Sequence, residues 1–231
     1  GGVAGRRSAM TLPTVAEVVD RADAIRQRVR AAGADPATVR LVAVTKGVEV
    51  GRIEEVLAAG VGALGESRAQ ELLAKAPGLA SWSPEWHFVG RLQRNKVPAL
   101  APHVALWQSV DRPETGEAIA RRQEKGRVLV EVNTSGEPQK GGCSPADAPV
   151  LVASLRGQGL AVEGLMTVPA RGRDPRPAFA SLRELAERLE LGELSMGMSD
   201  DFEVAVEEGA TMVRLGRALF GPRPAPPGVS R

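Results

Sequence analysis

The sequence predicts a single (β/α)8 barrel, an α/β fold in which eight parallel strands close into a ring surrounded by helices. Eight short apolar segments alternate with segments of helical periodicity along the chain. This alternation is typical of parallel sheets with right-handed crossovers, and eight such units in about 200 residues fit a closed barrel. An open doubly wound sheet is the alternative, because periodicity alone does not show whether a sheet closes.

Each predicted strand is a run of apolar and β-branched residues bounded by glycine, proline or polar residues. The strands are expected over residues 41–45, 61–65, 86–90, 104–107, 128–132, 160–166, 193–196 and 212–215. Thr14 and Glu17 form a capping box for the first helix. Further helices are expected over residues 52–59, 67–75, 92–100, 111–124, 144–155, 178–189 and 200–209, and a short last helix follows Gly216. Pro98 is a candidate early end of the helix over residues 92–100.

Composition and charge are those of a globular protein. Of 231 residues 43% are hydrophobic, and the formal net charge of +2 comes from interspersed charges, which gives no reason to expect a nucleic-acid partner. A single cysteine excludes an intrachain disulfide framework, and no apolar run approaches the ~18 residues of a membrane span. We therefore expect a cytoplasmic protein without a membrane partner. Residues 1–10 are expected to be a disordered leader, 11–221 the barrel and 222–231 a flexible tail.

Lys46 directly follows the apolar run 41–45 and is therefore expected at the carboxyl end of the first strand. In a barrel that end faces the mouth where active sites lie. Burial at such a rim disfavours the charged form of an amine, which makes Lys46 a candidate nucleophile for an aldehyde. The alternative is a surface lysine whose aliphatic stem lies along the strand end.

Two glycine-containing loops follow the seventh and eighth predicted strands. They read Gly197-Met198-Ser199 and Gly216-Arg217. Barrels often hold a phosphate between these two loops, on free N–H groups at the start of a helix, and the Ser199 hydroxyl could add a hydrogen bond. The alternative is that both glycines serve only tight turns.

Other reactive side chains have ordinary explanations. The two histidines, one inside a predicted strand and one in a loop, need not meet, so no metal site is expected. Cys143 fits a buried or half-buried thiol. Asp200 and Asp201 are explained by helix capping, with general acid–base work as the alternative. Lys140 lies in a long loop and is expected to be solvated, with a ligand contact as the alternative.

Seven stretches together carry a family resemblance. They are LVAVTK (41–46), GE…QE (65–71), WHFVGRLQ…NK (86–96), NTS…E…KG (133–141), GLM (164–166), SMGMSDD (195–201) and MVRLG…FG (212–221). Each is weak alone, but together they are specific. On these stretches the chain resembles the pyridoxal 5′-phosphate homeostasis protein family. The resemblance implies a barrel related to the alanine racemase N-terminal domain, with pyridoxal 5′-phosphate bound as a Schiff base on Lys46.

The resemblance also implies roles for single residues. Ser199, Gly216 and the adjacent Arg217 fall on phosphate-binding positions, and Arg214 falls on the partner of the pyridine nitrogen. The other positions that it assigns to the cofactor site are Ser67 and Met196. It further implies a monomeric cytosolic carrier or buffer without established turnover, whose partners are pyridoxal 5′-phosphate and apo forms of enzymes that use it.

The chain departs from the family pattern at two places. The family usually has Asn-Tyr after Gly-Glu, where this chain has Ser67-Arg68. The family usually has Thr or Ser after the last Arg-x-Gly, where this chain has Arg217. That arginine would either pair with the phosphate or turn to solvent, and its backbone N–H would stay available in both cases.

Two enzymatic hypotheses stand beside the carrier. A racemase-like enzyme of this fold class uses the Schiff-base lysine together with a tyrosine, and this chain contains no tyrosine. A lysine Schiff-base aldolase without a cofactor is the other. Arg214 likewise has an alternative role, as a barrel-interior ion pair with a glutamate such as Glu66.

Overall fold

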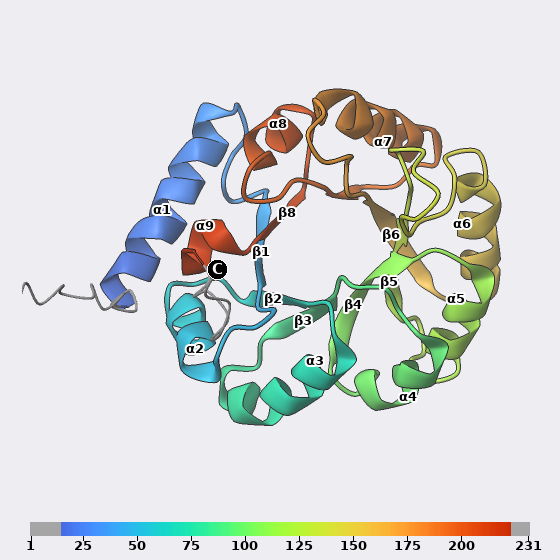
Figure 1. The fold of residues 1–231 in the computed structure, drawn as a ribbon. Coiled ribbons are helices and arrows are strands. Elements are labelled where there is room, and N and C mark those ends of the chain that lie inside the picture. Colours follow the sequence, from blue (N-terminus) through green and yellow to red (C-terminus); the bar gives the residue numbers. More distant parts are fainter. Residues whose placement is uncertain (1–14, 223–231) are drawn as a thin grey trace, which may run out of the picture.

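Residues 15–222 form a closed barrel of eight parallel strands that neighbour one another in sequence order (Figure 1). The computed structural model describes these residues, so the expected leader, Thr14 of the capping box and all but the first residue of the expected tail lie outside the described range. The first and last strands pair in parallel, with Val42 opposite Arg214, and this pairing closes the ring. The predicted (β/α)8 barrel is therefore confirmed, and the open sheet is wrong.

The strands and helices have the following bounds. The strands are β1 Arg40–Val44, β2 Ala63–Glu66, β3 Glu85–Phe88, β4 Val104–Val110, β5 Arg127–Glu131, β6 Ala161–Met166, β7 Glu193–Ser195 and β8 Met212–Leu215. The α-helices are α1 Val15–Ala31, α2 Val50–Ala58, α3 Ala69–Lys75, α4 Val97–Leu100, α5 Pro113–Ala120, α6 Ala148–Gly157, α7 Arg176–Arg188, α8 Phe202–Glu207 and α9 Arg217–Phe220. Two 3-10 helices, η1 Ala76–Trp82 and η2 Arg94–Lys96, complete the described set.

Most predicted elements are found within a few residues of their expected bounds, and the third and fourth units differ most. The helix expected over residues 92–100 is the 3-10 turn η2 followed by one turn of α4. Pro98 does not end that helix but lies in its first turn, where the missing N–H has no intrahelical acceptor to lose. Strand β4 continues to Val110, because its apolar run passes through the buried polar pair Gln108-Ser109 without a turn residue.

Two separate apolar clusters hold the barrel together. The larger lies between the sheet and the surrounding helices and includes the fully buried Phe179, Phe202 and Trp107. The smaller fills part of the barrel interior and consists of Val42, Ala63, Leu106, Leu129, Met166 and Met212. Burial of apolar surface is the main favourable term in folding, so the outer cluster supplies most of the stability.

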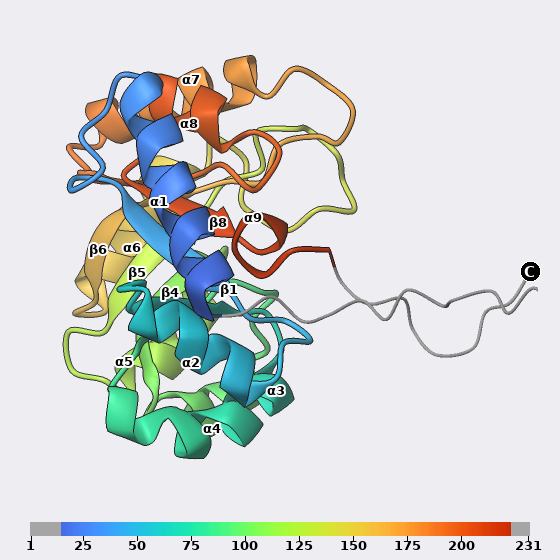
Figure 2. The same ribbon diagram turned by 90° about the vertical axis from the view of Figure 1, so that its left-hand side faces the viewer.

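The amino-terminal end of the barrel is closed by ion pairs. Arg127 binds Glu163 at 2.6 Å and Glu85 at 2.9 Å, and Arg40 reaches Glu85 at 3.4 Å. Figure 2 shows α9 and the long loops after β5 and β6 together on one side of the barrel. This side carries the carboxyl ends of the strands and is the open mouth. No helix among residues 15–222 is long and apolar enough to cross a membrane.

Gly164 provides a test of strand packing. A Cβ at this position in β6 would lie 1.9 Å from the carbonyl oxygen of Glu193 in the neighbouring β7. We expect Gly164→Ala to lower the free energy of unfolding by about 1–3 kcal/mol or more, because the clash is with backbone. Gly157→Ala is the matched control, since nothing lies within 4 Å of a Cβ there, and it should stabilise by about 0.4–1 kcal/mol. Urea unfolding measures both, and equal midpoints would contradict the packing described.

Candidate functional site

Three neighbouring strands bring the predicted lysine and the two glycine loops to one place. In the closed ring β7 pairs with β8 and β8 pairs with β1, so the residues after their carboxyl ends are adjacent. The Ala218 N–H donates to Ser199 Oγ at 3.2 Å, which ties the two loops to each other. A Cβ on Gly216 would lie 3.8 Å from the Val44 carbonyl oxygen, two residues before Lys46. The mouth therefore contains a lysine beside two glycine-containing loops whose backbone a ligand can approach.

Lys46 is half-buried, and within residues 15–222 its amine has no hydrogen-bond or ion-pair partner. The backbone on both sides of it is held. Thr45 Oγ1 donates to Glu66 Oε1 at 2.8 Å, and the Gly47 N–H donates to Glu71 Oε2 at 2.7 Å. The side chain of Lys46 is thus free to react while its attachment point is fixed.

The second lysine near the mouth, Lys75, is bound on every side. Its Nζ donates to the Thr45 carbonyl at 2.7 Å, to Glu66 Oε1 at 2.5 Å and to Glu71 Oε2 at 3.0 Å. Burial alone would raise the pKa of Glu71, but hydrogen bonds from Gly47 and Lys75 outweigh it and hold that pKa below its usual value. An ammonium with three acceptors is committed to structure, whereas the Lys46 amine has no such partner within residues 15–222.

The two loops offer backbone N–H groups in addition to the Ser199 hydroxyl. Among the described residues, no acceptor is present for the N–H of Ser199 or of Arg217. The Arg217 guanidinium pairs with Asp200, and both side chains are largely exposed, at 60% and 78%. Gly197 has φ +91°, and a Cβ there would lie 2.6 Å from that of Ala205, so both conformation and packing require glycine.

The two aspartates do not cap helix α8 as expected. Asp201 precedes the helix, but its side chain makes no capping hydrogen bond and instead accepts the Met198 N–H at 2.6 Å. It therefore braces the loop of Ser199. Asp200 points away and pairs with Arg217. The helix-capping interpretation is wrong, because an acid before a helix can bind the loop behind it as well as the turn ahead.

Arg214 is almost fully buried in the barrel, with 4% of its surface exposed. Its Nη1 donates to the carbonyl and hydroxyl oxygens of Ser195 at 2.8 and 2.7 Å, and its Nη2 donates to the Thr167 carbonyl at 2.8 Å. Burial lowers the pKa of Arg214 to about 10, although the carboxylates of Glu131 and Asp201 act in the opposite direction. The group is cationic at neutral pH.

The ion pair of Arg214 with Glu66, considered from the sequence, is wrong because the Glu66 carboxylate binds Lys75. A different carboxylate, that of Glu131, lies near enough to feel the Arg214 charge. Burial and the negative charge of Asp111 raise the pKa of Glu131 to about 7, and Arg214 opposes the rise. Glu131 ends β5 and was not singled out by any motif.

Two other predicted site residues lie apart from this group. Ser67 follows β2, and its carbonyl oxygen would be 2.1 Å from a Cβ on Gly90, so it packs against the loop after β3. Met196 is fully buried in the outer apolar cluster, and its N–H donates to the Met212 carbonyl at 3.1 Å. The structure brings together Lys46, Ser199, Arg214, Gly216 and Arg217, whereas the side chain of Met196 lies in the outer apolar cluster.

The remaining side chains that could react are unreactive or are bound to other groups. Burial raises the pKa of the half-buried Cys143 thiol to about 12, as expected of an unreactive thiol. No group of three metal-ligating side chains occurs among the residues that the structure describes. Lys140 is not solvated, because its Nζ donates to the Pro169 carbonyl at 2.9 Å and pairs with Glu137 at 2.8 Å. These contacts join the loops after β5 and β6.

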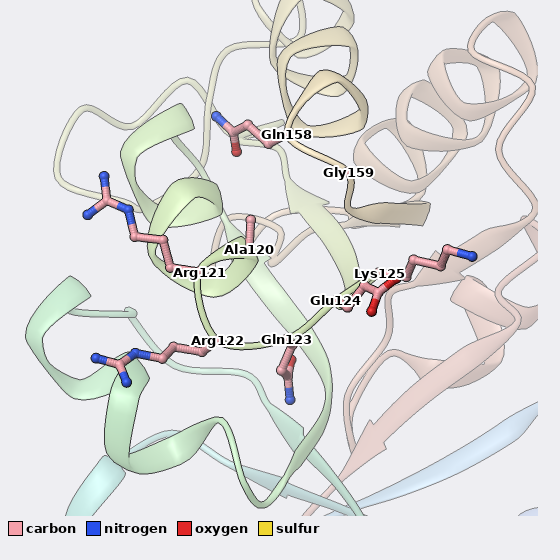
Figure 3. A pocket seen from close by; sticks show the side chains of 8 residues that line it. All are labelled: Ala120, Arg121, Arg122, Gln123, Glu124, Lys125, Gln158 and Gly159. Carbon is pink, nitrogen blue, oxygen red and sulfur yellow. The ribbon is translucent and has the colours of Figure 1, made fainter.

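A surface groove of about 370 Å³ lies away from the mouth, between the end of α5 and the loop before β6 (Figure 3). Its lining includes Arg121, Arg122 and Lys125. Figure 3 shows these cationic side chains pointing in different directions, so they do not converge on one ligand position. The groove therefore adds nothing to the site at the mouth.

Comparison with known proteins identifies the family to which the chain belongs. Residues 21–224 match the family described as alanine racemase, N-terminal domain. A pyridoxal phosphate homeostasis protein of Pseudomonas aeruginosa is 43% identical over 223 residues, covering 92% of this chain and 97% of the relative. The human pyridoxal phosphate homeostasis protein is 38% identical over 210 residues, covering 80% of this chain and 76% of the relative.

Solved structures show the same relationship. PipY of Synechococcus elongatus, solved with pyridoxal phosphate bound, superposes with a TM-score of 0.79 at 33% identity, covering 88% of this chain and all of PipY (100%). Alanine racemase of Corynebacterium glutamicum shares the fold, with a TM-score of 0.66 at 19% identity, and the match covers 96% of this chain and 66% of the racemase. The chain therefore belongs to the pyridoxal phosphate homeostasis protein family, whose fold is that of the alanine racemase N-terminal domain.

Proposed function

We propose that this protein binds pyridoxal 5′-phosphate and holds it as a reserve for enzymes that use it. Lys46 would carry the cofactor as a Schiff base, the loops of Ser199 and Gly216 would hold its phosphate, and Arg214 would face its ring nitrogen. The observation that carries the proposal is the amine of Lys46, which has no hydrogen-bond partner among the described residues and lies beside two glycine-containing loops. The neighbouring Lys75 amine, by contrast, already donates to three acceptors. The cytosol is the compartment we propose for it, with apo-enzymes as recipients and a monomer as the acting form.

The residues present fit the cofactor's three chemical handles. An aldehyde needs an uncommitted amine, and Lys46 has one. A phosphate needs several N–H donors and close backbone approach, which the N–H groups of Ser199 and Arg217 and the space above Gly216 supply. A pyridine nitrogen needs a donor, and Arg214 Nε–H has no acceptor among the described residues.

The same residues favour storage over catalysis. When bound, pyridoxal phosphate supplies an electron sink, which is strongest with a protonated ring nitrogen. Arg214 has only donors and stays charged, so it would leave that nitrogen unprotonated. A racemase-like site also needs a second proton-transfer group, and the chain has no tyrosine. The racemase-like enzyme and the cofactor-free aldolase stand as the alternatives to be tested.

Lys46→Ala should abolish covalent retention of the cofactor while leaving the fold intact, because the Lys46 side chain makes no hydrogen bond or ion pair within residues 15–222. The measurement is borohydride reduction of the loaded protein followed by peptide mass mapping, with circular dichroism for the fold. Lys96→Ala is the matched control and should retain the label. A label mapped to Lys140 or Lys96 in the unaltered protein would disprove the assignment, and no binding at all would favour the aldolase.

Ser199→Ala should weaken cofactor binding by roughly 1.5–3 kcal/mol, since it removes one charge-assisted hydrogen bond to the phosphate. This corresponds to about a tenfold to hundredfold rise in the dissociation constant. Gly216→Val should weaken binding further by filling the space above the backbone. Arg217→Ala is the control and should change affinity by less than about threefold, because its exposed pair with Asp200 is worth little. Unchanged affinity in both the Ser199 and Gly216 variants, measured by titration, would place the phosphate elsewhere.

The loaded protein should exchange the α-proton of D- or L-alanine at close to the rate of free cofactor. The physical reasons are the donor-only Arg214 and the missing tyrosine. NMR in deuterated buffer measures the exchange, with Lys46→Ala as the background. Exchange at about 1 s⁻¹ or faster, an ordinary enzymatic rate, would contradict storage as the sole function and favour the racemase-like enzyme.

A further inference from the structure

A line of buried polar side chains crosses the barrel interior beneath Arg214. Arg214 Nη1 lies 2.7 Å from Ser195 Oγ, and Ser195 Oγ lies 2.6 Å from Gln108 Oε1. Gln108 Nε2 lies 2.7 Å from His87 Nδ1, and His87 Nε2 lies 3.3 Å from Glu85 Oε1. Ser195, Gln108 and His87 are completely buried.

This line, here called the lumen chain, is not a product of strand pairing. Gln108 lies on β4 and Ser195 on β7, and in the closed ring β5 and β6 separate these strands. The hydrogen bond between their side chains therefore spans the interior of the barrel. At its far end Glu85 belongs to the ion-pair cluster with Arg127 and Arg40 that closes the amino-terminal end. The lumen chain thus connects the closed end of the barrel with the mouth.

The hydrogen bonds of the lumen chain all run in one direction. Arg214 can only donate, so the Ser195 hydroxyl accepts from it and sends its own proton to Gln108 Oε1. The Gln108 amide then presents its NH₂ to His87 Nδ1, which must accept. His87 consequently carries its proton on Nε2, facing the Glu85 carboxylate. The opposite amide orientation would turn a lone pair of His87 toward that carboxylate, which is repulsive.

The contact between His87 and Glu85, at the far end of the lumen chain, favours the same direction of the hydrogen bonds. The contact of His87 Nε2 with Glu85 is electrostatic rather than a well-aligned hydrogen bond. The interaction with His87 is nevertheless the largest influence on Glu85 and, together with Arg127, lowers the pKa of Glu85 to about 2. Glu85 is therefore a permanent carboxylate beside the Nε2 side of the His87 ring.

We propose that Ser195, Gln108 and His87 are positioning residues that fix the guanidinium of Arg214 for its contact with the cofactor's ring nitrogen. The inference rests on the proposed function, because it concerns the same site. Ser195 and the Thr167 carbonyl occupy both terminal nitrogens of Arg214. Rotation of the guanidinium would break its bonds to Ser195 and to the Thr167 carbonyl and leave its terminal nitrogens without acceptors in a dry interior, where unpaired polar groups are costly. The Nε–H, which has no acceptor among the described residues, is thereby held in one orientation.

The first test examines the protein without cofactor. The chain contains only two histidines, so ¹⁵N NMR resolves both, and His103→Asn identifies the signal of His87. At neutral pH the ring of His87 should be protonated on Nε2 and not on Nδ1. In Gln108→Glu the side chain loses its donor, so the proton should appear on Nδ1. Gln123→Glu is the matched control outside the barrel interior and should leave the tautomer of His87 unchanged. Protonation of His87 on Nδ1 in the unaltered protein would contradict the proposed direction of the hydrogen bonds in the lumen chain.

The second test examines the loaded protein with ¹⁵N in the ring of pyridoxal 5′-phosphate. Ser195→Ala and Gln108→Leu should shift the ring-nitrogen resonance and raise the cofactor dissociation constant by about threefold to tenfold. Ser195→Thr restores the hydroxyl and should return the signal toward its original position. Gln123→Leu, which removes hydrogen bonds to Trp107, Ala101 and Val104, should affect stability but not the resonance.

Positioning through Arg214 has a further signature. In an Arg214→Lys background, Ser195→Ala and Gln108→Leu should cause no additional shift of the ring-nitrogen signal, because the group they orient is gone. An additional shift there, or no shift in the original background, would overturn the inference while leaving the cofactor site in place. Failure of the unaltered protein to bind the cofactor, or a ring nitrogen indifferent to Arg214→Lys, would instead overturn the proposed function.

Discussion

A permanent positive charge inside the barrel, the guanidinium of Arg214, sets the chemistry of the interior around it. Removing an unpaired guanidinium from water is costly unless acceptors replace the water. No carboxylate touches it among the described residues, and oxygens of Ser195 and Thr167 take that place. Within the interior, the smaller apolar cluster therefore shares the space with the buried polar side chains of Ser195, Gln108 and His87.

The mouth combines a fixed frame with an uncommitted amine. Lys75, Glu66 and Glu71 form a buried charge cluster whose hydrogen bonds reach the residues before and after Lys46. A buried lysine with two carboxylates is weak support for stability as such, but it defines where the chain leaves β1. The frame on the other side is the brace of Asp201 on the Met198 N–H. The first frame holds the backbone around Lys46, and the second holds the loop of Ser199.

The hydrophobic periodicity and the positions of glycine and proline predicted the barrel, because each strand is a short apolar run that glycine or proline separates from the next helix. The same reasoning placed Lys46 at the mouth. It missed the cluster of Lys75, since a lysine at the end of a helix does not reveal that its amine folds back onto Glu66 of the preceding strand. It misread Asp201, whose position before a helix predicts a cap in the absence of the loop behind it. Gln108 gave no signal, because a polar residue between apolar neighbours in a strand does not reveal its partner across the ring.

The separation of the outer apolar cluster from the barrel interior has a consequence for how such a protein can change over generations. The number of folded copies depends chiefly on the outer cluster. Under the proposed function, the affinity of each copy for the cofactor depends instead on the interior and the mouth. The number of folded copies and the affinity of each copy thus depend on different layers of the molecule. Substitutions that accumulate in one layer can therefore have little effect on the property that the other layer determines.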